Sequence, residues 1–126
     1  EMVQSCKDLL VWQKAVALVK EVYQATQPFP PHELYGLAGQ LRRAAVSVPS
    51  NIAEGQARQS SAEFHHFLTI AYGSLAELDT QVIIARELGY LTDDGANSLS
   101  NKTAEVGRMM NALISQIAKK RTNNER

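Results

Sequence analysis

Apolar side chains recur at alternating spacings of three and four residues in four separate segments of the chain. That spacing is typical of a helix that buries one face. The predicted helices cover approximately residues 6–27, 31–55, 60–88 and 93–121. Because the connections between them are short, successive helices are expected to pack antiparallel. The pattern predicts an all-α protein, an antiparallel up-down-up-down four-helix bundle that forms a single domain over residues 1–126.

Each predicted helix carries one apolar stripe, and the stripes together define the expected core. Residues on one stripe share a face because side chains three and four positions apart are neighbours on a helix surface. A domain of this length can bury such faces in one continuous core. The expected core residues, helix by helix, are Leu9, Trp12, Val16, Val19 and Tyr23; Leu34, Leu37, Leu41, Ala45, Val48 and Ile52; Phe64, Leu68, Ala71, Leu75, Leu78, Val82 and Ala85; and Ala96, Leu99, Thr103, Val106, Met110, Leu113 and Ile117.

Proline and glycine indicate where the predicted helices end or bend. The run PFPP at residues 28–31 ends the first helix, because consecutive prolines cannot continue one. Pro49 falls inside the second stripe, which keeps its phase across the proline. We therefore expect one helix that is kinked at Pro49 rather than two helices. Gly55 and Gly89 are expected to end the second and third helices.

Polar residues suited to capping precede three of the stripes. Ser5 with Asp8, and Ser60 with Glu63, have the three-residue spacing of a capping box. Thr92 is the expected N-cap of the fourth helix, since its hydroxyl can accept a hydrogen bond from a first-turn amide. These residues place three of the four helix starts.

Composition is typical of a folded, soluble domain. Of the 126 residues, 44% are hydrophobic and 21% are charged, values that do not indicate disorder. The apolar runs are far shorter than the roughly 20 residues of a membrane-spanning helix, and no secretory leader opens the chain. Cys6 is the only cysteine, which excludes an internal disulfide and a cysteine-based zinc cluster. We therefore expect a cytoplasmic protein.

Charge is balanced overall but uneven along the chain. The net charge is zero, while residues 59–90 carry one basic and four acidic side chains and residues 91–126 carry six basic and four acidic ones. A dedicated nucleic-acid binder is usually strongly basic, so this balance counts against that role. Basic residues at the end of the fourth helix also balance its dipole. The candidate nucleic-acid contacts are Arg42, Arg58, Lys119, Lys120 and Arg121.

The second and third predicted helices lack the charged outer face that a bundle helix normally turns to water. Their outer faces carry small and apolar residues, and each helical glycine costs about 1 kcal/mol relative to alanine. The surface is either slightly atypical or a subunit interface, and we favour the interface, with Arg43 and Glu77 as candidates for pairing across it. The predicted interface residues are Gly36, Gly39, Arg43, Ser47, Ser50, Glu54, Ile70, Gly73, Glu77 and Ile84.

The residue groups that could form a metal site or a catalytic site are each incomplete. Glu63 and His66 form a Glu-x-x-His pair, but di-iron bundles use this pair twice with two further glutamates, and here it occurs once. Ser47, Ser50 and Asn51 lie on one helical stretch without a nearby histidine, so no nucleophile and base can be assigned. We therefore predict a protein that is not an enzyme, without metal, cofactor or small-molecule substrate.

Several stretches resemble one family of bacterial proteins. The strongest is SVPSNIAEG at residues 47–55, followed by Arg58. The opening DLLVWQKA at residues 8–15 and QLRRAA at residues 40–45 fit the same pattern, as do YGL, FL, AYGS and EL further along. The chain resembles the four-helix bundle proteins encoded within intervening sequences of bacterial 23S rRNA genes. The likeness covers about residues 8 to 91.

The resemblance implies an assembly rather than an activity. It implies a ring-shaped homopentamer, in which the motif positions lie on the predicted interface. It also implies kinship with accessory proteins of diversity-generating retroelements, which associate with a reverse transcriptase and nucleic acid. We therefore predict a non-catalytic homo-oligomeric scaffold or interaction module that contacts itself and, as a further partner, structured RNA. The alternative is an RNA- or DNA-binding accessory protein that partners a reverse transcriptase.

Overall fold

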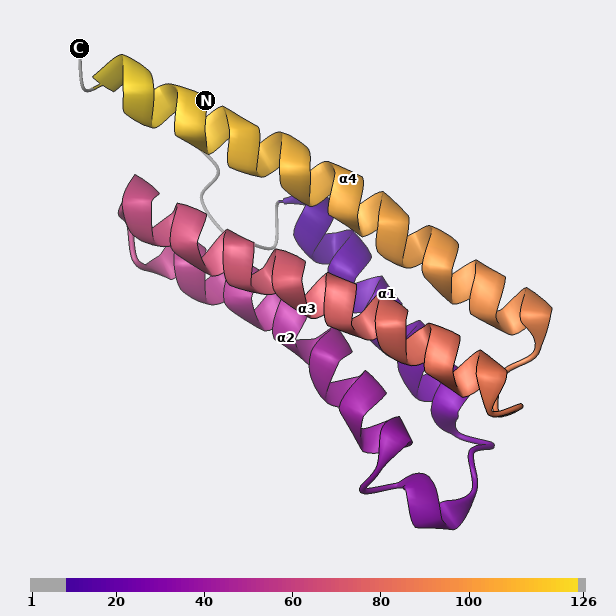
Figure 1. Cartoon of the computed structure of the whole chain (residues 1–126). Helices are drawn as coiled ribbons and strands as arrows, with labels where there is room; N and C mark the ends of the chain where they lie inside the picture. Colours follow the sequence, from indigo (N-terminus) through magenta and orange to yellow (C-terminus); the bar gives the residue numbers. More distant parts are fainter. Residues whose placement is uncertain (1–8, 125–126) are drawn as a thin grey trace.

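The computed structural model describes residues 9–124, with side chains described through residue 120. The regular secondary structure of that part of the chain is all helical, and it contains no strand (Figure 1). No helix in it combines the length and the apolar run that a membrane span requires. The all-α prediction is confirmed. The elements are α1 (Leu10–Thr26), the short 3₁₀ helix η2 (Pro31–Glu33), α2 (Leu37–Ala57), α3 (Ser61–Glu87) and α4 (Asp93–Asn124).

The helices pack as a four-helix bundle. α1 lies against α2 and α4, and α3 lies against the same two helices, so α1 and α3 are diagonal neighbours. In Figure 1 the α2–α3 connection lies at the end of the bundle opposite to the α1–α2 and α3–α4 connections. Ion pairs between Glu21 and Lys102 and between Lys14 and Glu105 link α1 to α4.

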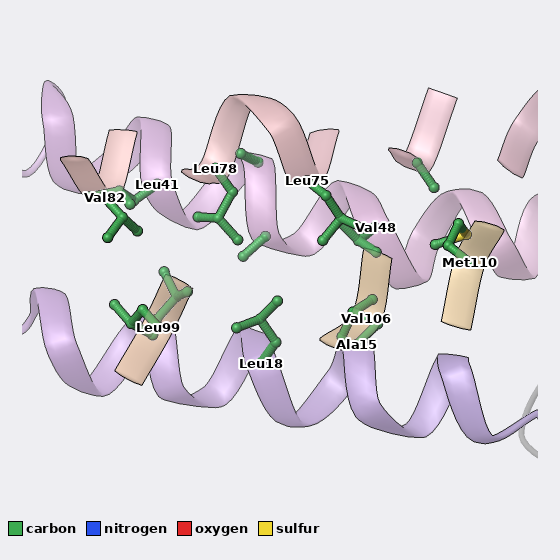
Figure 2. Packing of buried hydrophobic residues seen from close by; sticks show 14 of the residues in the cluster. Ala15, Leu18, Leu41, Val48, Leu75, Leu78, Val82, Leu99, Val106 and Met110 are labelled. Carbon is green, nitrogen blue, oxygen red and sulfur yellow. The ribbon is translucent and has the colours of Figure 1, made fainter. Parts of the chain in front are cut away.

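The core runs the length of the bundle between all four helices. Figure 2 shows Leu18, Leu41, Leu78 and Leu99, one from each long helix, among the side chains that meet there. The stripe predicted for α3 is buried from Leu68 to Ala85, with its first residue partly buried. Most of the stripes predicted for α2 and α4 are also buried. The sequence pattern therefore identified the core of these three helices.

The core face of α1 differs from the prediction. The structure buries Val11, Ala15, Leu18 and Val22, whereas Tyr23 of the predicted stripe is exposed, as is Val16. α1 carries two apolar stripes that are offset by one residue, and both have helical spacing. The buried stripe is the one that faces between α2 and α4. The second stripe is left half-exposed along the side of α1.

α2 begins six residues later than predicted, at Leu37 rather than residue 31. The backbone of Gly36 is not helical, with φ −106° and ψ −119°, and it separates α2 from the 3₁₀ turn. The Glu33 carboxylate accepts a hydrogen bond from the Leu37 amide (2.9 Å), so it satisfies a donor that the first turn leaves unpaired. As a result Leu34 lies outside the helix and is exposed, and its predicted place in the core is wrong.

α2 continues past Gly55 to Ala57, so the predicted helix end at Gly55 is wrong. Gly55 is buried where α2 meets α3. A Cβ built on Gly55 would lie 2.7 Å from Cβ of Phe67 and 3.1 Å from Cδ1 of Phe64. The glycine is needed because it allows this close approach. Pro49 is buried inside α2, and its kink stays a prediction.

The observed helix caps agree with the sequence prediction more closely than the start and end of α2 do. Ser60 Oγ accepts a hydrogen bond from the Glu63 amide (3.3 Å), and Thr92 Oγ1 accepts one from the Gly95 amide (3.0 Å). Gly89 follows α3 with φ +79°, a conformation that glycine adopts readily. The capping box at Ser5 lies outside the described residues. α4 extends three residues beyond the predicted end at residue 121.

The close approach at Gly55 can be tested with a pair of glycine substitutions. We expect Gly55→Ala to destabilise the protein by about 1–3 kcal/mol, the usual cost of overpacking, even though alanine is the better helix former. The matched variant Gly107→Ala places its Cβ 3.7 Å from Cε1 of Tyr72, an ordinary contact, and should stabilise by up to about 1 kcal/mol. Urea unfolding followed by circular dichroism measures both. Equal stability of Gly55→Ala and wild type would contradict the predicted overlap.

Candidate functional site

The SVPSNIAEG stretch lies in α2 where it packs on α3, and part of it holds the two helices together. The hydroxyls of Ser47 and Ser74 are hydrogen-bonded (2.8 Å). Asn51 Nδ2 donates to the carbonyl and to the hydroxyl of Ser47 (2.8 and 2.9 Å). Ser74 Oγ also contacts the Ile70 carbonyl (3.3 Å). Ser47 was predicted as an interface residue, and the structure places its hydroxyl in a polar network within the subunit.

Two of the glycines predicted at the interface are required by the turn before α2. A Cβ on Gly36, the N-cap of α2, would lie 2.5 Å from Oε1 of Glu33. A Cβ on Gly39 would lie 2.7 Å from the Leu34 carbonyl oxygen and 3.2 Å from Nη1 of Arg43. Both glycines therefore have a reason inside the subunit. Helical-wheel reasoning missed this reason because the residues they meet precede the helix.

Four of the predicted interface residues lie together on the outward side of α3. Ile70, Gly73, Glu77 and Ile84 are all exposed. A Cβ built on Gly73 meets no atom within 4 Å, so nothing in the subunit requires glycine there. Gln81 donates to the carboxylate of Glu77 (3.2 Å). We call this group of four residues the α3 surface.

A second surface lies at the junction of α1, the 3₁₀ turn and α2. It is a groove in which apolar and aromatic side chains surround two arginines. Sequence reasoning missed most of its apolar lining, because Tyr23 and Leu34 were assigned to the core. The second apolar stripe of α1 is the signal that identifies it. We call it the α1–α2 surface; its residues are Tyr23, Leu34, Tyr35, Gly39, Arg42, Arg43, Val46 and Ser47.

The two arginines of the α1–α2 surface differ in their contacts. Arg42 Nε donates to Thr26 Oγ1 (2.9 Å), and its guanidinium carbon lies 4.6 Å from the centre of the Tyr23 ring. Arg42 thus ties α2 to α1 through a hydrogen bond and a cation–π contact. Arg43 is exposed at the groove. Arg42 is therefore a structural residue in the subunit, while Arg43 presents its charge to the surroundings.

Glu33 holds the turn that displays Leu34 and Tyr35. Its carboxylate accepts hydrogen bonds from the Leu37 amide (2.9 Å) and from the Tyr90 hydroxyl (3.0 Å). Both bonds favour the charged form, so the Leu37 amide first, and the Tyr90 hydroxyl after it, lower the pKa of Glu33. The same bond to Glu33 raises the pKa of Tyr90. The Phe29 and Tyr90 rings pack 5.2 Å apart beside this contact.

Two of the basic residues predicted to contact nucleic acid have partners within the subunit. Arg42 is engaged with α1, as described above. Arg58, at the end of α2, pairs with Glu54 (2.9 Å) and Glu63 (3.6 Å), and the hydrogen bond to Glu54 raises the pKa of Arg58. Lys119 and Lys120 are exposed near the end of α4. The side chain of Arg121 lies outside the described residues.

The remaining predicted site residues are Ser50 and Glu54 on α2, and both are exposed. Glu54 is the partner of Arg58. The Glu63–His66 pair considered as a metal site is also committed elsewhere, because Glu63 pairs with Arg58 and the His66 ring packs edge-on against Phe67. Among the described residues, no group of three or more His, Cys, Asp or Glu side chains is placed to hold a metal ion.

Comparison with known proteins connects the chain to one family. The model of the family described as 23S rRNA-intervening sequence protein matches residues 7–112. A crystal structure of a protein with unknown function, from the S23 ribosomal protein family of Bacteroides thetaiotaomicron VPI-5482, has a similar fold with a TM-score of 0.75. That protein is 21% identical, and the similarity covers 83% of this chain and 98% of that one. No curated protein matches the chain.

The anchoring of the turn by Glu33 predicts a pH dependence of stability. Because the pKa of Glu33 is lowered on folding from its ordinary 4.5, its contribution is present above about pH 4.5 and is lost as pH falls through the lowered value. Glu33→Gln keeps the shape but removes the charge. We expect this variant to melt at a lower temperature than wild type at pH 7, with the difference shrinking in more acidic buffer. Thermal unfolding measured across pH 7 to 3 tests this. Glu87→Gln, an exposed glutamate that pairs with Arg86, is the control, and a pH-independent difference for Glu33→Gln would contradict the anchoring.

Proposed function

The chain belongs to the 23S rRNA-intervening sequence protein family, and on that premise we propose that it acts as a non-catalytic, homo-oligomeric interaction module. In this proposal the working form is an assembly of several copies, with the ring-shaped pentamer that the sequence resemblance implies as its expected form. The structural relative is itself described as a protein with unknown function. It therefore supports the bundle fold and brings no activity to this chain.

The observation that carries the proposal is Gly73 on the α3 surface. A glycine inside a helix costs about 1 kcal/mol relative to alanine, and the 4 Å around a Cβ at Gly73 are empty within the subunit. On the same face of α3, Ile70 lies one turn before it and Ile84 about three turns after it, and they are 40% and 43% exposed. A face that exposes two isoleucines and has open space at a glycine suits the close approach of another protein surface. A partner subunit supplies a reason for glycine that the isolated bundle lacks.

The polar residues of the SVPSNIAEG stretch support a non-catalytic role. A serine nucleophile needs a base within hydrogen-bonding reach to take its proton. The described hydrogen bonds of the Ser47 hydroxyl are to Ser74 and Asn51, and an amide or a hydroxyl is a poor base. The network therefore has the composition of a structural contact between α2 and α3.

Substitution of Gly73 tests the proposed assembly. We expect Gly73→Lys to leave the subunit folded, because the site is open, and to reduce the oligomer to smaller species, because the lysine projects into the interface. Light scattering coupled to size-exclusion chromatography gives the mass. Ala17→Lys, on an exposed position of α1 outside both surfaces, is the matched control. A wild-type protein that is monomeric at micromolar concentration would overturn the proposal.

Charge reversal at Arg43 tests the same assembly from α2. Arg43→Glu places a carboxylate where an exposed guanidinium stood, so we expect a weaker oligomer, with a dissociation midpoint shifted to at least about tenfold higher protein concentration. Sedimentation velocity over a dilution series measures the shift. Arg108→Glu, an exposed arginine of α4, controls for the change in net charge. If the two variants dissociate alike, Arg43 has no particular place in the interface.

A further inference from the structure

α3 and α4 form a groove of about 630 Å³ whose lining residues all come from these two helices. Its α3 wall runs from Tyr72 to Arg86. That wall lies roughly 130° around the helix axis from the α3 surface, so the groove would stay open in the proposed assembly. We call it the α3–α4 groove; residues of its floor and walls include Tyr72, Ala76, Asp79, Ile83, Ala104 and Gly107.

The floor of the α3–α4 groove is apolar and low. Ala76, Ala104 and Gly107 bring no large side chain to it. Ile83 and Tyr72 stand above the floor and are 43% and 40% exposed. A low floor between exposed apolar side chains suits a helix, whose own side chains pack into such a groove.

Charged side chains line the same groove in a definite order. Arg86 and Asp79 are seven residues apart on α3, about 10 Å along the helix. Arg108 of α4 follows Gly107, and a Cβ on Gly107 would lie 3.7 Å from Cε1 of Tyr72. Because Tyr72 is another seven residues from Asp79, the charges alternate positive, negative and positive at intervals of about 10 Å.

Two of these three charges have no opposite charge beside them in the subunit. Among the residues that the structure describes, neither Asp79 nor Arg108 forms an ion pair, while Arg86 pairs with its neighbour Glu87 (3.3 Å). Asp79 is also partly buried, so its carboxylate loses contact with water without gaining a cation. A ligand that places a cation at the centre of the groove would supply one.

The order of the charges distinguishes between classes of ligand. An RNA strand carries a negative charge on every nucleotide, so a strand along the groove would bring phosphates against Asp79. A protein helix can carry a different charge at each turn, and residues two turns apart lie on the same face. The apolar floor and the central carboxylate therefore favour a helix.

We propose that the α3–α4 groove binds an amphipathic helix of a partner protein. The helix lays its apolar face on the groove floor and carries an acidic, a basic and an acidic residue about two turns apart. The acidic residues pair with Arg86 and Arg108, and the basic residue pairs with Asp79. This inference goes beyond the proposed homo-oligomer, because it concerns a different surface and a different partner.

The probes are synthetic amphipathic peptides that are long enough to span the groove, with alanine and leucine on one face. The matched peptide carries Glu, Lys and Glu two turns apart, and the reordered peptide carries the same residues as Lys, Glu and Glu. Composition and net charge are identical, so only the order of charges differs. Fluorescence anisotropy of each labelled peptide, titrated with the full-length protein, gives the Kd. We expect the matched peptide to bind at least about tenfold more tightly.

Substitutions at Asp79 locate the binding. Asp79→Asn keeps the size and removes the charge, so the matched peptide should lose its advantage. Asp79→Lys should instead prefer, by at least about tenfold, a third peptide with Glu at all three positions. Glu77→Lys is the control, because it makes the same kind of charge reversal at an exposed position of α3, roughly 160° away around the helix. It should keep the preference of wild type. Far-UV circular dichroism checks that each variant is folded.

Several results would overturn the inference. Equal binding of the matched and reordered peptides to wild type is one, and a preference that survives Asp79→Asn is another. If neither peptide binds but a labelled single-stranded RNA does, and Arg108→Glu abolishes that binding, the groove serves nucleic acid. If Arg108→Glu lowers the mass of the wild-type assembly, a second copy fills the groove. A monomeric wild type would overturn the homo-oligomer alone, because the peptide titrations do not depend on it.

Discussion

The close contact between α2 and α3 is the constraint on which the rest of the bundle depends. Gly55 meets Phe64 and Phe67 near one end of this contact, and Ser47 meets Ser74 near its middle. A backbone that approaches an aromatic side chain this closely leaves little freedom in the relative position of the two helices. α1 and α4 then complete the core by covering the apolar faces that this pair leaves open.

The same contact explains why the SVPSNIAEG stretch of α2 has both buried and exposed residues. Val48, Ile52 and Gly55 are buried. Ser47 joins α2 to α3 through Ser74, and Asn51 donates hydrogen bonds to Ser47 within α2. Ser50 and Glu54 remain on the outside. Because the inward residues position α2 and α3 so closely, they also set the spacing of the outward-facing surfaces on these helices. If copies associate as proposed, packing within the subunit and recognition between subunits are coupled in this one short stretch.

Helical spacing was sufficient to predict the core of α3, because that helix carries a single well-separated buried stripe from Leu68 to Ala85. It was insufficient for α1, where two stripes offset by one residue have the same period, and only the positions of α2 and α4 decide which is buried. The start of α2 was missed for a different reason. The amide of its first residue, Leu37, donates to the carboxylate of Glu33, which is fixed by Tyr90, a residue 57 positions away.

The candidate site shows the same limit. Sequence reasoning found Gly73, Ile70, Glu77 and Ile84 on the outside of α3, where the structure places them. It also assigned Gly39 and Ser47 to the interface, which stays a prediction, but it missed the contacts that both residues make within the subunit. A helical wheel gives the direction in which a side chain points, but not which residues it meets in that direction. The aromatic part of the α1–α2 surface was hidden because exposed apolar residues with helical spacing look like core residues.

The bond between Glu33 and Tyr90 has a consequence for the order of events during synthesis. The turn that presents Tyr35 is made early in translation, but its anchor arrives only when the ribosome has passed residue 90 and α3 has docked. A chain that is truncated or stalled before that point lacks the bond from Tyr90 and holds the turn only through the local bond between Glu33 and the Leu37 amide. The final position of Tyr35 therefore depends on a residue far along the chain, Tyr90.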